Sequence, residues 1–236
     1  MYLSLKDRVV VVSGASRGIG RASALELARA GARLALLARD QDALGAVREA
    51  AQGLGAEARV YPSDLRRPEE VERAAAALLA DFGRVDALVN NAAVGRYGGF
   101  LDLSREDFAE MLDVNVLGVV ALTQALLPAM LARGEGHVLM VASVQGLAAT
   151  ATSAAYSASK FALVGLTRSL ALDVGPQGVR VTLLCPGSVA TDFDGFPGRM
   201  KPLALTAEDV AQTIREMLET GGRAHLSEAV LVPFRS

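Results

Sequence analysis

Three residues in the second half of the chain, Ser143, Tyr156 and Lys160, could together move a proton to or from an oxygen atom. Tyr156 and Lys160 are four residues apart in a predicted helix over 153–174, so they share one helical face. A tyrosine, with an ordinary pKa of about 10, is a poor base at neutral pH, but a nearby lysine cation favours its phenolate. Ser143 ends a predicted strand and could hold a carbonyl or alkoxide oxygen. By itself, this tyrosine–lysine spacing is an ordinary helical pair.

A glycine-rich turn near the start of the chain predicts a phosphate site. A predicted strand over 8–12 runs into Ser13-Gly14-Ala15-Ser16-Arg17-Gly18-Ile19-Gly20, and a predicted helix over 18–30 follows. Gly14 permits a tight turn, Gly18 lets the backbone approach a phosphate, and Gly20 lets the helix pack close to the strand. The unpaired N–H groups at the start of the helix attract an anion. A plain strand-to-helix turn is the alternative, but the position at the start of an alternating α/β pattern favours nucleotide binding.

The end of the second predicted strand, 33–38, indicates which nucleotide binds. A site for NAD usually has a carboxylate there, roughly 20 residues beyond the glycines, for the ribose 2′-hydroxyl. Ala38 stands at that position instead and Arg39 follows. Arg39 and Arg17 have planar donor groups that suit a 2′-phosphate, so we expect NADP, with NAD as the weaker alternative. The preference would reverse if Asp40 met the ribose; otherwise Asp40 only caps the next helix.

The elements that must position these residues alternate between strand and helix. The pattern predicts strands over 8–12, 33–38, 58–62, 85–90, 137–142, 179–185 and 229–232, and helices over 18–30, 41–52, 68–82, 104–131, 153–174 and 206–219. Alternation with apolar strands indicates a parallel sheet covered on both faces. We expect α/β architecture: one doubly wound Rossmann-type domain over 1–236, with a mostly parallel seven-stranded sheet and helices on both faces. With 51% hydrophobic residues among 236, the chain can bury one large core.

Composition and spacing exclude several classes of function. The formal net charge is −2, from 24 basic and 26 acidic residues, whereas nucleic-acid binders carry a basic excess. His137 and His225 lie too far apart for zinc-ligand spacing, and the single cysteine, Cys185, can form no disulfide within the chain, so no metal is expected. The longest apolar stretch, 114–132, contains polar residues and Pro128, which favours a buried or interface helix over a membrane span. No targeting segment is visible, and we expect a cytoplasmic protein.

Taken together, these features resemble the short-chain dehydrogenase/reductase family in its compact form, and in particular its 3-oxoacyl-acyl-carrier-protein reductases. The matching pieces follow the family's order and spacing from Val9 to about Asp192. They are Gly14-x-x-x-Gly18-Ile19-Gly20, Asp64-Leu65, Asn90-Asn91-Ala92-Ala93, Asn115, Ser143, Tyr156-x-x-x-Lys160 and Pro186-Gly187. An ordered set of this kind is far more specific than any one of its motifs.

The resemblance implies a role for each matched residue. Tyr156 would be the acid/base that protonates the alkoxide in reduction, and Lys160 would lower its pKa and hold the nicotinamide ribose. Ser143 would fix the substrate carbonyl, and Asn115 would hold a water that relays protons toward Lys160. Asp64 would bond the adenine. The other expected cofactor contacts are Gly14, Ser16, Arg17, Gly18, Ile19, Gly20, Arg39, Leu65, Asn90, Ala92, Pro186, Gly187, Val189 and Thr191.

The resemblance therefore implies an NADP(H)-dependent oxidoreductase that interconverts a carbonyl and an alcohol by hydride transfer. A 3-oxoacyl-thioester reductase is the alternative within the family, although the ending 227–236 lacks the Asp-Gly-Gly that follows the last strand of many members. A non-catalytic module that senses NADP is an alternative of another class, but such proteins usually have a damaged catalytic tetrad. The expected partners are a small-molecule substrate and further copies of the chain, as a homodimer or homotetramer, because family members commonly pair through the helices that carry Asn115 and Tyr156.

The segment 192–205 is the expected substrate lid. It carries two glycines and two prolines and precedes a helix with a predicted cap. Phe193, Phe196 and Met200 in this segment could close on a substrate, and ordinary core packing is the alternative for all three. The sequence names no particular substrate.

Overall fold

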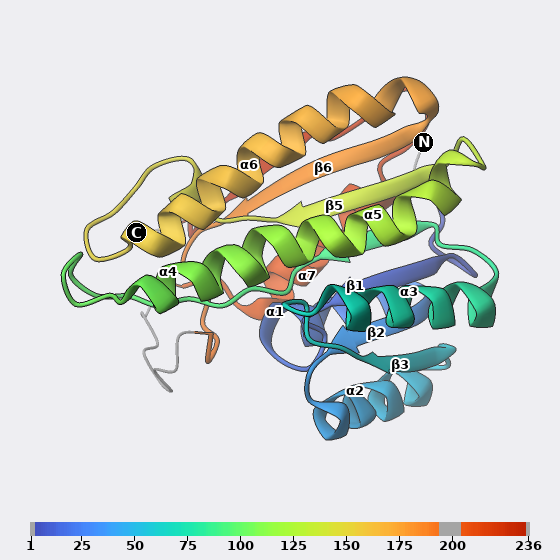
Figure 1. Cartoon of the computed structure of the whole chain (residues 1–236). Helices are drawn as coiled ribbons and strands as arrows, with labels where there is room; N and C mark the ends of the chain where they lie inside the picture. Colours follow the sequence, from blue (N-terminus) through green and yellow to red (C-terminus); the bar gives the residue numbers. More distant parts are fainter. Residues whose placement is uncertain (1–2, 194–203, 235–236) are drawn as a thin grey trace.

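A computed structural model describes residues 3–193 and 204–234 of the chain. Its strands are β1 (Val9–Ser13), β2 (Arg33–Ala38), β3 (Ala58–Pro62), β4 (Ala87–Asn90), β5 (Gly136–Val141), β6 (Val179–Pro186) and β7 (Glu228–Leu231). Its α-helices are α1 (Gly18–Arg29), α2 (Gln41–Gly53), α3 (Pro68–Phe82), α4 (Arg105–Leu112), α5 (Gly118–Leu131), α6 (Ala154–Val174) and α7 (Ala207–Glu219) (Figure 1). The predicted elements are all present, with bounds that differ by two residues at most apart from the helix expected over 104–131.

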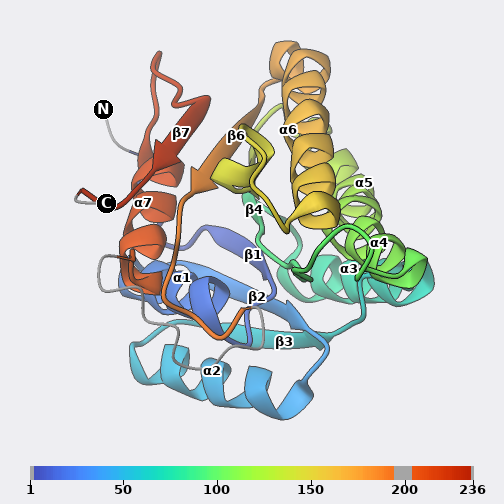
Figure 2. The ribbon, with the colours of Figure 1, turned by 90° about the vertical axis from the view of Figure 1, so that its left-hand side faces the viewer.

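The seven strands form one sheet in the order β3-β2-β1-β4-β5-β6-β7, and every neighbouring pair is parallel. Helices α3, α4, α5 and α6 cover one face, while α1, α2 and α7 cover the other (Figure 2). The predicted doubly wound α/β fold is therefore confirmed. The strand order reverses between β1 and β4, and in such sheets ligands bind outside the carboxyl ends of the strands at that point.

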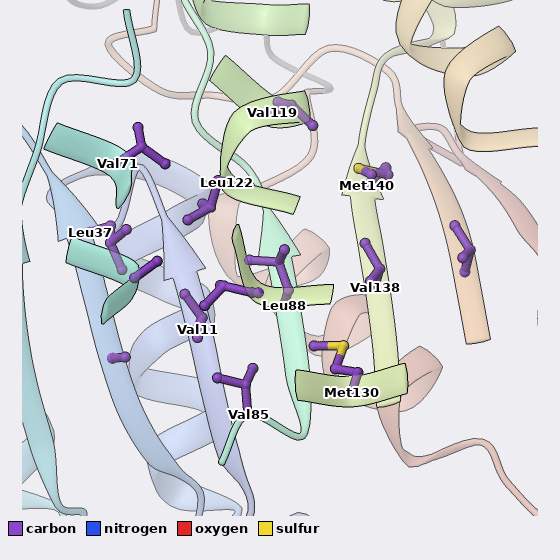
Figure 3. Close-up of a cluster of buried hydrophobic side chains, with 14 of the residues drawn as sticks. Val11, Leu37, Val71, Val85, Leu88, Val119, Leu122, Met130, Val138 and Met140 are labelled. Atoms are coloured by element: carbon purple, nitrogen blue, oxygen red, sulfur yellow. The ribbon is translucent and has the colours of Figure 1, made fainter. Parts of the chain in front are cut away.

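Alternate residues of the strands supply two separate cores. Val9 and Val11 of β1 belong to the core beneath α3, α5 and α6, whereas Val10 and Val12 belong to the core beneath α1, α2 and α7. Figure 3 shows the first core, in which Val11 lies among side chains of neighbouring strands and covering helices. Side chains alternate along a strand, so a strand buried on both faces is apolar throughout, as this one is.

The helix expected over 104–131 is interrupted. Ser104 begins it with a capping box, in which the Ser104 side chain accepts from the Asp107 amide. The chain then widens into a π-helical turn over Asp113–Leu117 before continuing as α5. Such turns cost helix stability and are frequent at functional sites. The wide turn contains Asn115, whose contacts are described with the site.

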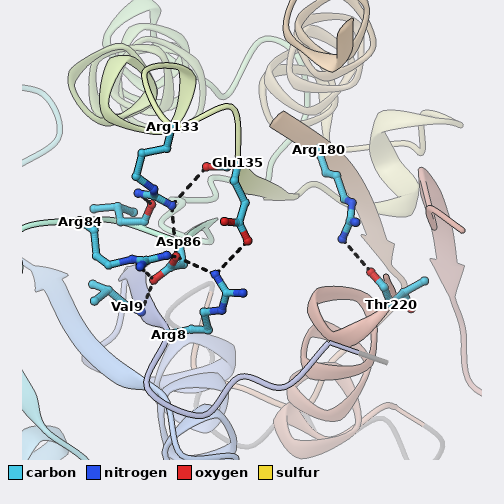
Figure 4. Close-up of polar contacts among 9 residues, drawn as sticks. Arg8, Val9, Arg84, Asp86, Arg133, Glu135, Arg180 and Thr220 are labelled. Atoms are coloured by element: carbon cyan, nitrogen blue, oxygen red, sulfur yellow. Dashed lines mark hydrogen bonds and ion pairs between the residues drawn. The ribbon is translucent and has the colours of Figure 1, made fainter. Parts of the chain in front are cut away.

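A buried carboxylate organises the end of the sheet opposite the cleft. Asp86 accepts hydrogen bonds from Arg8, Arg84, Arg133 and the backbone amide of Val9 (Figure 4). Burial favours the neutral carboxyl, but the bonds from Arg84, the Val9 amide and Arg8 hold the pKa of Asp86 below its usual range. This network joins the starts of β1 and β4 to the end of α5, and it stabilises the fold away from the chemistry.

The sheet brings together two histidines that are far apart in the sequence. The rings of His137 and His225 lie 5.9 Å apart, and the Nε2 atom of His137 is 2.7 Å from the Thr182 hydroxyl. Burial lowers the pKa of His137 to about 3. Among the described residues, no group of three potential ligands could hold a metal ion.

By length and composition, the continuous helical run Arg105–Leu131 could cross a membrane. Buried core helices pass the same test, and 44% of the most apolar window of this run is buried inside the structure. The run packs along α3 and α6, in the layer that covers the sheet (Figure 1).

Candidate active site

A cleft of about 1120 Å³ lies at the carboxyl ends of the strands. It extends from the glycine turn after β1, past the ends of β2 and β3, to the loops after β4, β5 and β6. Most of the residues expected at the site line it: Gly14, Ser16, Arg17, Gly18, Ile19, Arg39, Asp64, Leu65, Ala92, Ser143, Tyr156, Lys160, Pro186, Gly187, Val189 and Thr191. The cleft occupies the place that the strand order indicates.

The glycines of the turn are required by close approach. Gly14 has φ +65°, and a Cβ atom there would lie 2.8 Å from Cα of Ala92. A Cβ atom at Gly20 would lie 2.1 Å from the Gly14 carbonyl oxygen, so Gly20 lets α1 pack against the turn and does not itself line the cleft. These contacts match the two roles expected for Gly14 and Gly20.

Hydrogen bonds join the glycine turn to the loop after the neighbouring strand β4. Asn91 donates from Nδ2 to the carbonyl oxygens of Ser13 (3.0 Å) and Gly14 (3.3 Å). The Ser13 hydroxyl in turn accepts from the amides of Asn91 and Ala92. Asn91 also lines the cleft. The sequence also predicts a cofactor contact for Asn90, but the Asn90 side chain is buried, donates to the Thr123 hydroxyl and does not line the cleft.

The beginning of α1 is suited to an anion. Its N-cap, Arg17, has extended backbone and makes no capping hydrogen bond with its side chain. The first N–H groups of the helix therefore remain available at the cleft, and they carry the positive end of the helix dipole. The Arg17 guanidinium donates to the Asp192 carbonyl oxygen at 3.0 Å, which ties the turn to the loop after β6. These features fit the pyrophosphate of a dinucleotide.

The end of β2 resolves the position of Asp40. The strand ends at Ala38, which pairs with Pro62 of β3, and the Asp40 side chain accepts from the Ala43 amide at 2.9 Å as the N-cap of α2. Asp40 is therefore a helix cap. Arg39, between Ala38 and Asp40 in the chain, lines the cleft. Within the described residues, the Arg39 side chain forms no hydrogen bond or ion pair.

The carboxylate expected to meet the adenine is already paired. Arg66 donates to both oxygens of Asp64, and the Arg66 amide donates to it as well. These contacts hold the pKa of Asp64 below its usual range, with a further contribution from the charge of Arg39. Asp64 thus stays ionised at the cleft, and its geometry is fixed by Arg66, a residue that no sequence motif singled out.

Tyr156 is the buried phenol of the site, with 7% of its surface exposed. Burial raises the pKa of Tyr156 above its usual range, the Tyr97 phenol adds to the rise, and a hydrogen bond with Ser143 opposes it. The Ser143 hydroxyl also accepts from the Gln145 amide at 3.1 Å, which fixes its position at the end of β5. Tyr156 and Ser143 therefore both line the cleft, and their roles in proton transfer stay predictions.

Lys160 lies one turn along α6, fully inside the protein with 2% exposed. Its Nζ atom is 5.6 Å from the centre of the Tyr156 ring and donates to the Val141 carbonyl oxygen at 3.1 Å. Burial lowers the pKa of Lys160 to about 8. The expected lowering of the Tyr156 pKa by Lys160 is not found. The Lys160 ammonium lies near the Tyr156 ring and is bonded to the Val141 carbonyl oxygen. Burial of the phenol is the largest effect on the Tyr156 pKa, and it raises that pKa.

Asn115 connects the π-helical turn to the rest of the site. Its Oδ1 atom accepts from the Val94 amide at 2.8 Å, and its Nδ2 atom donates to the Val94 carbonyl and the Ser159 hydroxyl. Asn115 is fully buried and does not line the cleft. Its side chain therefore holds the loop after β4 against α6. The role in a water relay toward Lys160 stays a prediction.

The expected lid is only partly within the described residues. Asp192, Phe193, Ala204 and Leu205 are described, whereas Phe196 and Met200 lie outside. A bridge between Val189 and Leu205 brings the two ends of the segment together beside the cleft. Phe193 lines the cleft and packs edge-on against Tyr156. The sequence did not indicate Tyr97, which lines the same place, because nothing in its local pattern marks it.

Comparison with known proteins agrees with this geometry. The family described as short chain dehydrogenase matches residues 8–200. Oxidoreductase UcpA of Salmonella typhimurium is 40% identical over 188 residues, which are 79% of this chain and 71% of that protein. A metagenomic short-chain oxidoreductase solved in complex with NADP superposes with a TM-score of 0.87 at 36% identity, over 98% of this chain and 99% of that one.

A second solved structure is similar over the same extent. Alcohol dehydrogenase from the archaeon Thermococcus sibiricus, complexed with 5-hydroxy-NADP, has a TM-score of 0.90 at 35% identity and covers 96% of both chains. The family match spans most of the chain and includes the glycine turn, Ser143, Tyr156 and Lys160. The chain is therefore an oxidoreductase of the short-chain dehydrogenase/reductase family.

Proposed function

We propose that this enzyme interconverts a carbonyl compound and an alcohol with NADP(H), and that Tyr156 is its acid/base. The observation that carries the proposal is that Tyr156, Ser143 and Lys160 line one cleft at the carboxyl ends of the strands. A glycine turn with an uncapped helix start lies at the other end of the same cleft. Phosphate site and proton donor are thus held in one cavity, as hydride transfer followed by proton transfer requires.

The mechanism follows from these positions. NADPH, when bound, supplies the hydride. The Ser143 hydroxyl donates a hydrogen bond to the substrate oxygen and fixes it beside Tyr156. Tyr156, whose raised pKa keeps it protonated, gives its proton to that oxygen as negative charge develops there. Lys160 places a cation 5.6 Å from the ring centre, so the phenolate that forms has a positive charge near it.

The residues that would hold NADP are those of the cleft. Gly14, Gly18 and the start of α1 would receive the pyrophosphate, and Asp64 and Ala92 would lie on the adenosine side. Pro186, Gly187, Val189 and Thr191 would hold the nicotinamide end, together with Lys160. The close approach of Gly14 to Ala92 supports the pyrophosphate part of this assignment, because a side chain at Gly14 would not fit.

The preference for NADP over NAD is proposed from Arg39, which lines the cleft where Asp40 is engaged as a cap. Arg39→Asp should weaken NADPH binding by roughly 10- to 100-fold relative to NADH, since a charge-assisted contact to phosphate is lost and a like charge replaces it. Dissociation constants for both nucleotides, measured by fluorescence titration, check this. Arg48→Asp, on the exposed side of α2, is the control, and an unchanged ratio in Arg39→Asp would remove Arg39 from cofactor selection.

A 3-oxoacyl-thioester reductase is the second candidate within the same chemistry, and a non-catalytic NADP-binding module is the candidate of another class. Oxidation of NADPH by the purified protein separates them. A simple ketone and a 3-oxoacyl thioester should be compared at equal concentration, with NADH in parallel. We expect turnover with the ketone. Turnover with the thioester alone would select the second candidate, and tight NADPH binding with no turnover on either would favour the module.

We also propose that the protein assembles as a homodimer or homotetramer through α5 and α6. Leu117 on the π-helical turn and Phe161 and Leu172 on α6 are exposed by 59%, 46% and 78%. Exposed apolar side chains gathered on adjacent helices are typical of subunit contacts. Size-exclusion chromatography with light scattering should give a mass of two or four chains, and Leu117→Glu together with Leu172→Glu should reduce it. A monomeric mass for the unaltered protein would contradict the proposal.

A further inference from the structure

Three aromatic rings meet at the end of the cleft that holds Tyr156. The ring centre of Tyr97 lies 5.4 Å from that of Tyr156 at a tilt of 45°. The ring centre of Phe193 lies 5.8 Å from that of Tyr156, edge-on at 63°. Tyr97 belongs to the loop after β4 and Phe193 to the loop after β6, and both line the cleft. A substrate at the Tyr156 hydroxyl therefore has these two rings as neighbours.

Gly95 provides the space in which the rings come together. A Cβ atom at Gly95 would lie 2.8 Å from Cε1 of Phe193 and 3.2 Å from Cε2 of Tyr97. The backbone φ of Gly95 is outside the left-handed region, so no turn requires a glycine there. The space that Gly95 leaves is filled by the edges of both rings. This part of the chain is thus shaped to bring aromatic surface against the cleft.

The arginines that line the described part of the cleft lie at its other end, whereas Asp192, next to Phe193 in the chain, is an acidic residue that lines it. Arg17, Arg21 and Arg39 line it at the glycine turn, on α1 and after β2, which is the cofactor end. Arg96, beside Tyr97 in the sequence, pairs with Glu110 and does not line the cleft.

Near Tyr156, the side chains that line the described part of the cleft are mainly apolar or carry hydroxyl and amide groups. They include Val94, Ser143, Gln145, Thr150 and Thr152. Lys160 is the cation among them, and it is directed to the Val141 carbonyl oxygen. Among the described residues, a carboxylate on the substrate would therefore lose its hydration here without gaining an arginine partner.

We propose that Tyr97 and Phe193 form an aromatic wall that selects uncharged ketones with a flat, unsaturated ring attached to the carbonyl carbon. The inference rests on the proposed function, because it concerns the carbonyl compound that Tyr156 protonates. Aromatic rings at these separations and tilts attract one another through edge-to-face and offset contacts beyond the effect of buried area. A saturated ring of the same size fills the space without those contacts. The preference amounts to about 3- to 10-fold for each ring pair.

The test compares acetophenone with cyclohexyl methyl ketone, which differ in the unsaturation of one ring, and with phenylglyoxylate, which adds a carboxylate. The variants are Tyr97→Leu and Phe193→Leu. Phe100→Leu is the matched control, because Phe100 is an aromatic residue of the same loop region that is 70% exposed and does not line the cleft. The measured quantity is the ratio of kcat/KM for acetophenone to that for cyclohexyl methyl ketone, since the intrinsic reactivity of each ketone cancels between variants.

We expect this ratio to fall about 3- to 10-fold in each wall variant and to stay constant in the control, with NADPH affinity unchanged. Phenylglyoxylate should be the poorest substrate of the three for the unaltered enzyme. A ratio that is the same in all four proteins, or phenylglyoxylate as the best substrate, would overturn the proposal.

A binding measurement keeps this proposal separate from the proposed function. Calorimetric titration of Tyr156→Phe with each ketone, in the presence of NADP⁺, gives dissociation constants. Their ratio compares the binding of acetophenone with that of cyclohexyl methyl ketone. If no ketone supports NADPH oxidation in the unaltered protein, the proposed function fails. The aromatic wall is tested independently by adding Tyr97→Leu to Tyr156→Phe. The proposal predicts that the preference in binding for acetophenone over cyclohexyl methyl ketone then decreases, and an unchanged preference would contradict it.

Discussion

Tyr156→Phe should lower kcat for carbonyl reduction by at least about a hundredfold while NADPH affinity changes less than about threefold, because general acid catalysis contributes roughly 10²–10⁴ in rate and the phenyl ring preserves the packing. The ring of Tyr156 packs with Tyr97, Phe193 and Met111, and none of those contacts involves its oxygen. The loss should therefore appear in the chemical step and not in folding. Steady-state rates, with NADPH binding followed by fluorescence, measure both quantities.

The control for this variant is Tyr61→Phe. Tyr61, on β3, is also buried and does not line the cleft. Its hydroxyl donates to Asp81 of α3 at 2.7 Å. Removal of that hydroxyl should cost about 1 kcal/mol of stability and leave the rate unchanged. If Tyr156→Phe kept more than a tenth of the rate, Tyr156 would not be the proton donor.

Lys160→Met should produce an inactive protein that is more stable than the original at pH 7. Lys160 is 2% exposed, and burial lowers its pKa to about 8 from the ordinary lysine value of 10.5. A shift of this size means that the buried charge of Lys160 lowers the free energy of unfolding by about 3 kcal/mol at neutral pH. Loss of the bond to the Val141 carbonyl offsets about 1 kcal/mol. The net gain should raise the Tm by several degrees, at about 2–4 °C per kcal/mol for a chain of this size.

The pH dependence has a definite sign. Between about pH 8 and pH 10.5 the unfolded chain holds a proton on Lys160 that the folded chain has released. The free energy of unfolding contributed by this group therefore rises with pH across that window and is lowest below pH 8. The difference in Tm between the original protein and Lys160→Met should shrink as the pH rises from 8 to 10.5. A variant that is less stable at every pH would contradict the reading of Lys160 as a strained, functional charge.

Much of the fold follows from local patterns that the sequence displays directly. The β1 residues Val9–Val12 are apolar at every position because both faces of the sheet are covered. Ser104, Pro68 and Thr206 begin their helices as expected, since caps depend on a few adjacent residues. The phosphate turn is recognised locally from its glycine spacing, although Gly14 is required by a distant segment, because a Cβ atom there would lie 2.8 Å from Cα of Ala92.

The parts that sequence reasoning missed depend on contacts between distant segments. The π-helical turn at Asp113–Leu117 accompanies the bonds of Asn115 to Val94 and Ser159, which come from other elements. Asn90 and Asn91 are neighbours in one motif, and only the direction of the strand end sends Asn90 into the core and Asn91 to the turn. Gly95 is an ordinary loop glycine in the sequence, because the Phe193 and Tyr97 rings that occupy the space beside it are recognised only in the structure.

The position of Asp40 at the end of β2 bears on whether NAD or NADP binds. Whether Ala38 or Asp40 lies at the ribose position could not be fixed from the sequence, because a shift of one residue reverses it. The register of β2 with β3 and the capping bond from the Ala43 amide to Asp40 settle which residue ends the strand. The expected choice of NADP then rests on Arg39 and Arg17, which both line the cleft, and the Arg39→Asp titration addresses the first of them.

The central claim, that this protein transfers a hydride to a carbonyl carbon, is tested most directly with NADPH carrying deuterium at the transferred position of the nicotinamide. The purified protein is incubated with this nucleotide and acetophenone, and the alcohol is analysed by mass spectrometry. Direct transfer predicts one deuterium on the carbinol carbon in the unaltered protein and no alcohol above background with Tyr156→Phe. Deuterium absent from the alcohol, or no alcohol from any carbonyl offered while the nucleotide still binds, would contradict the account.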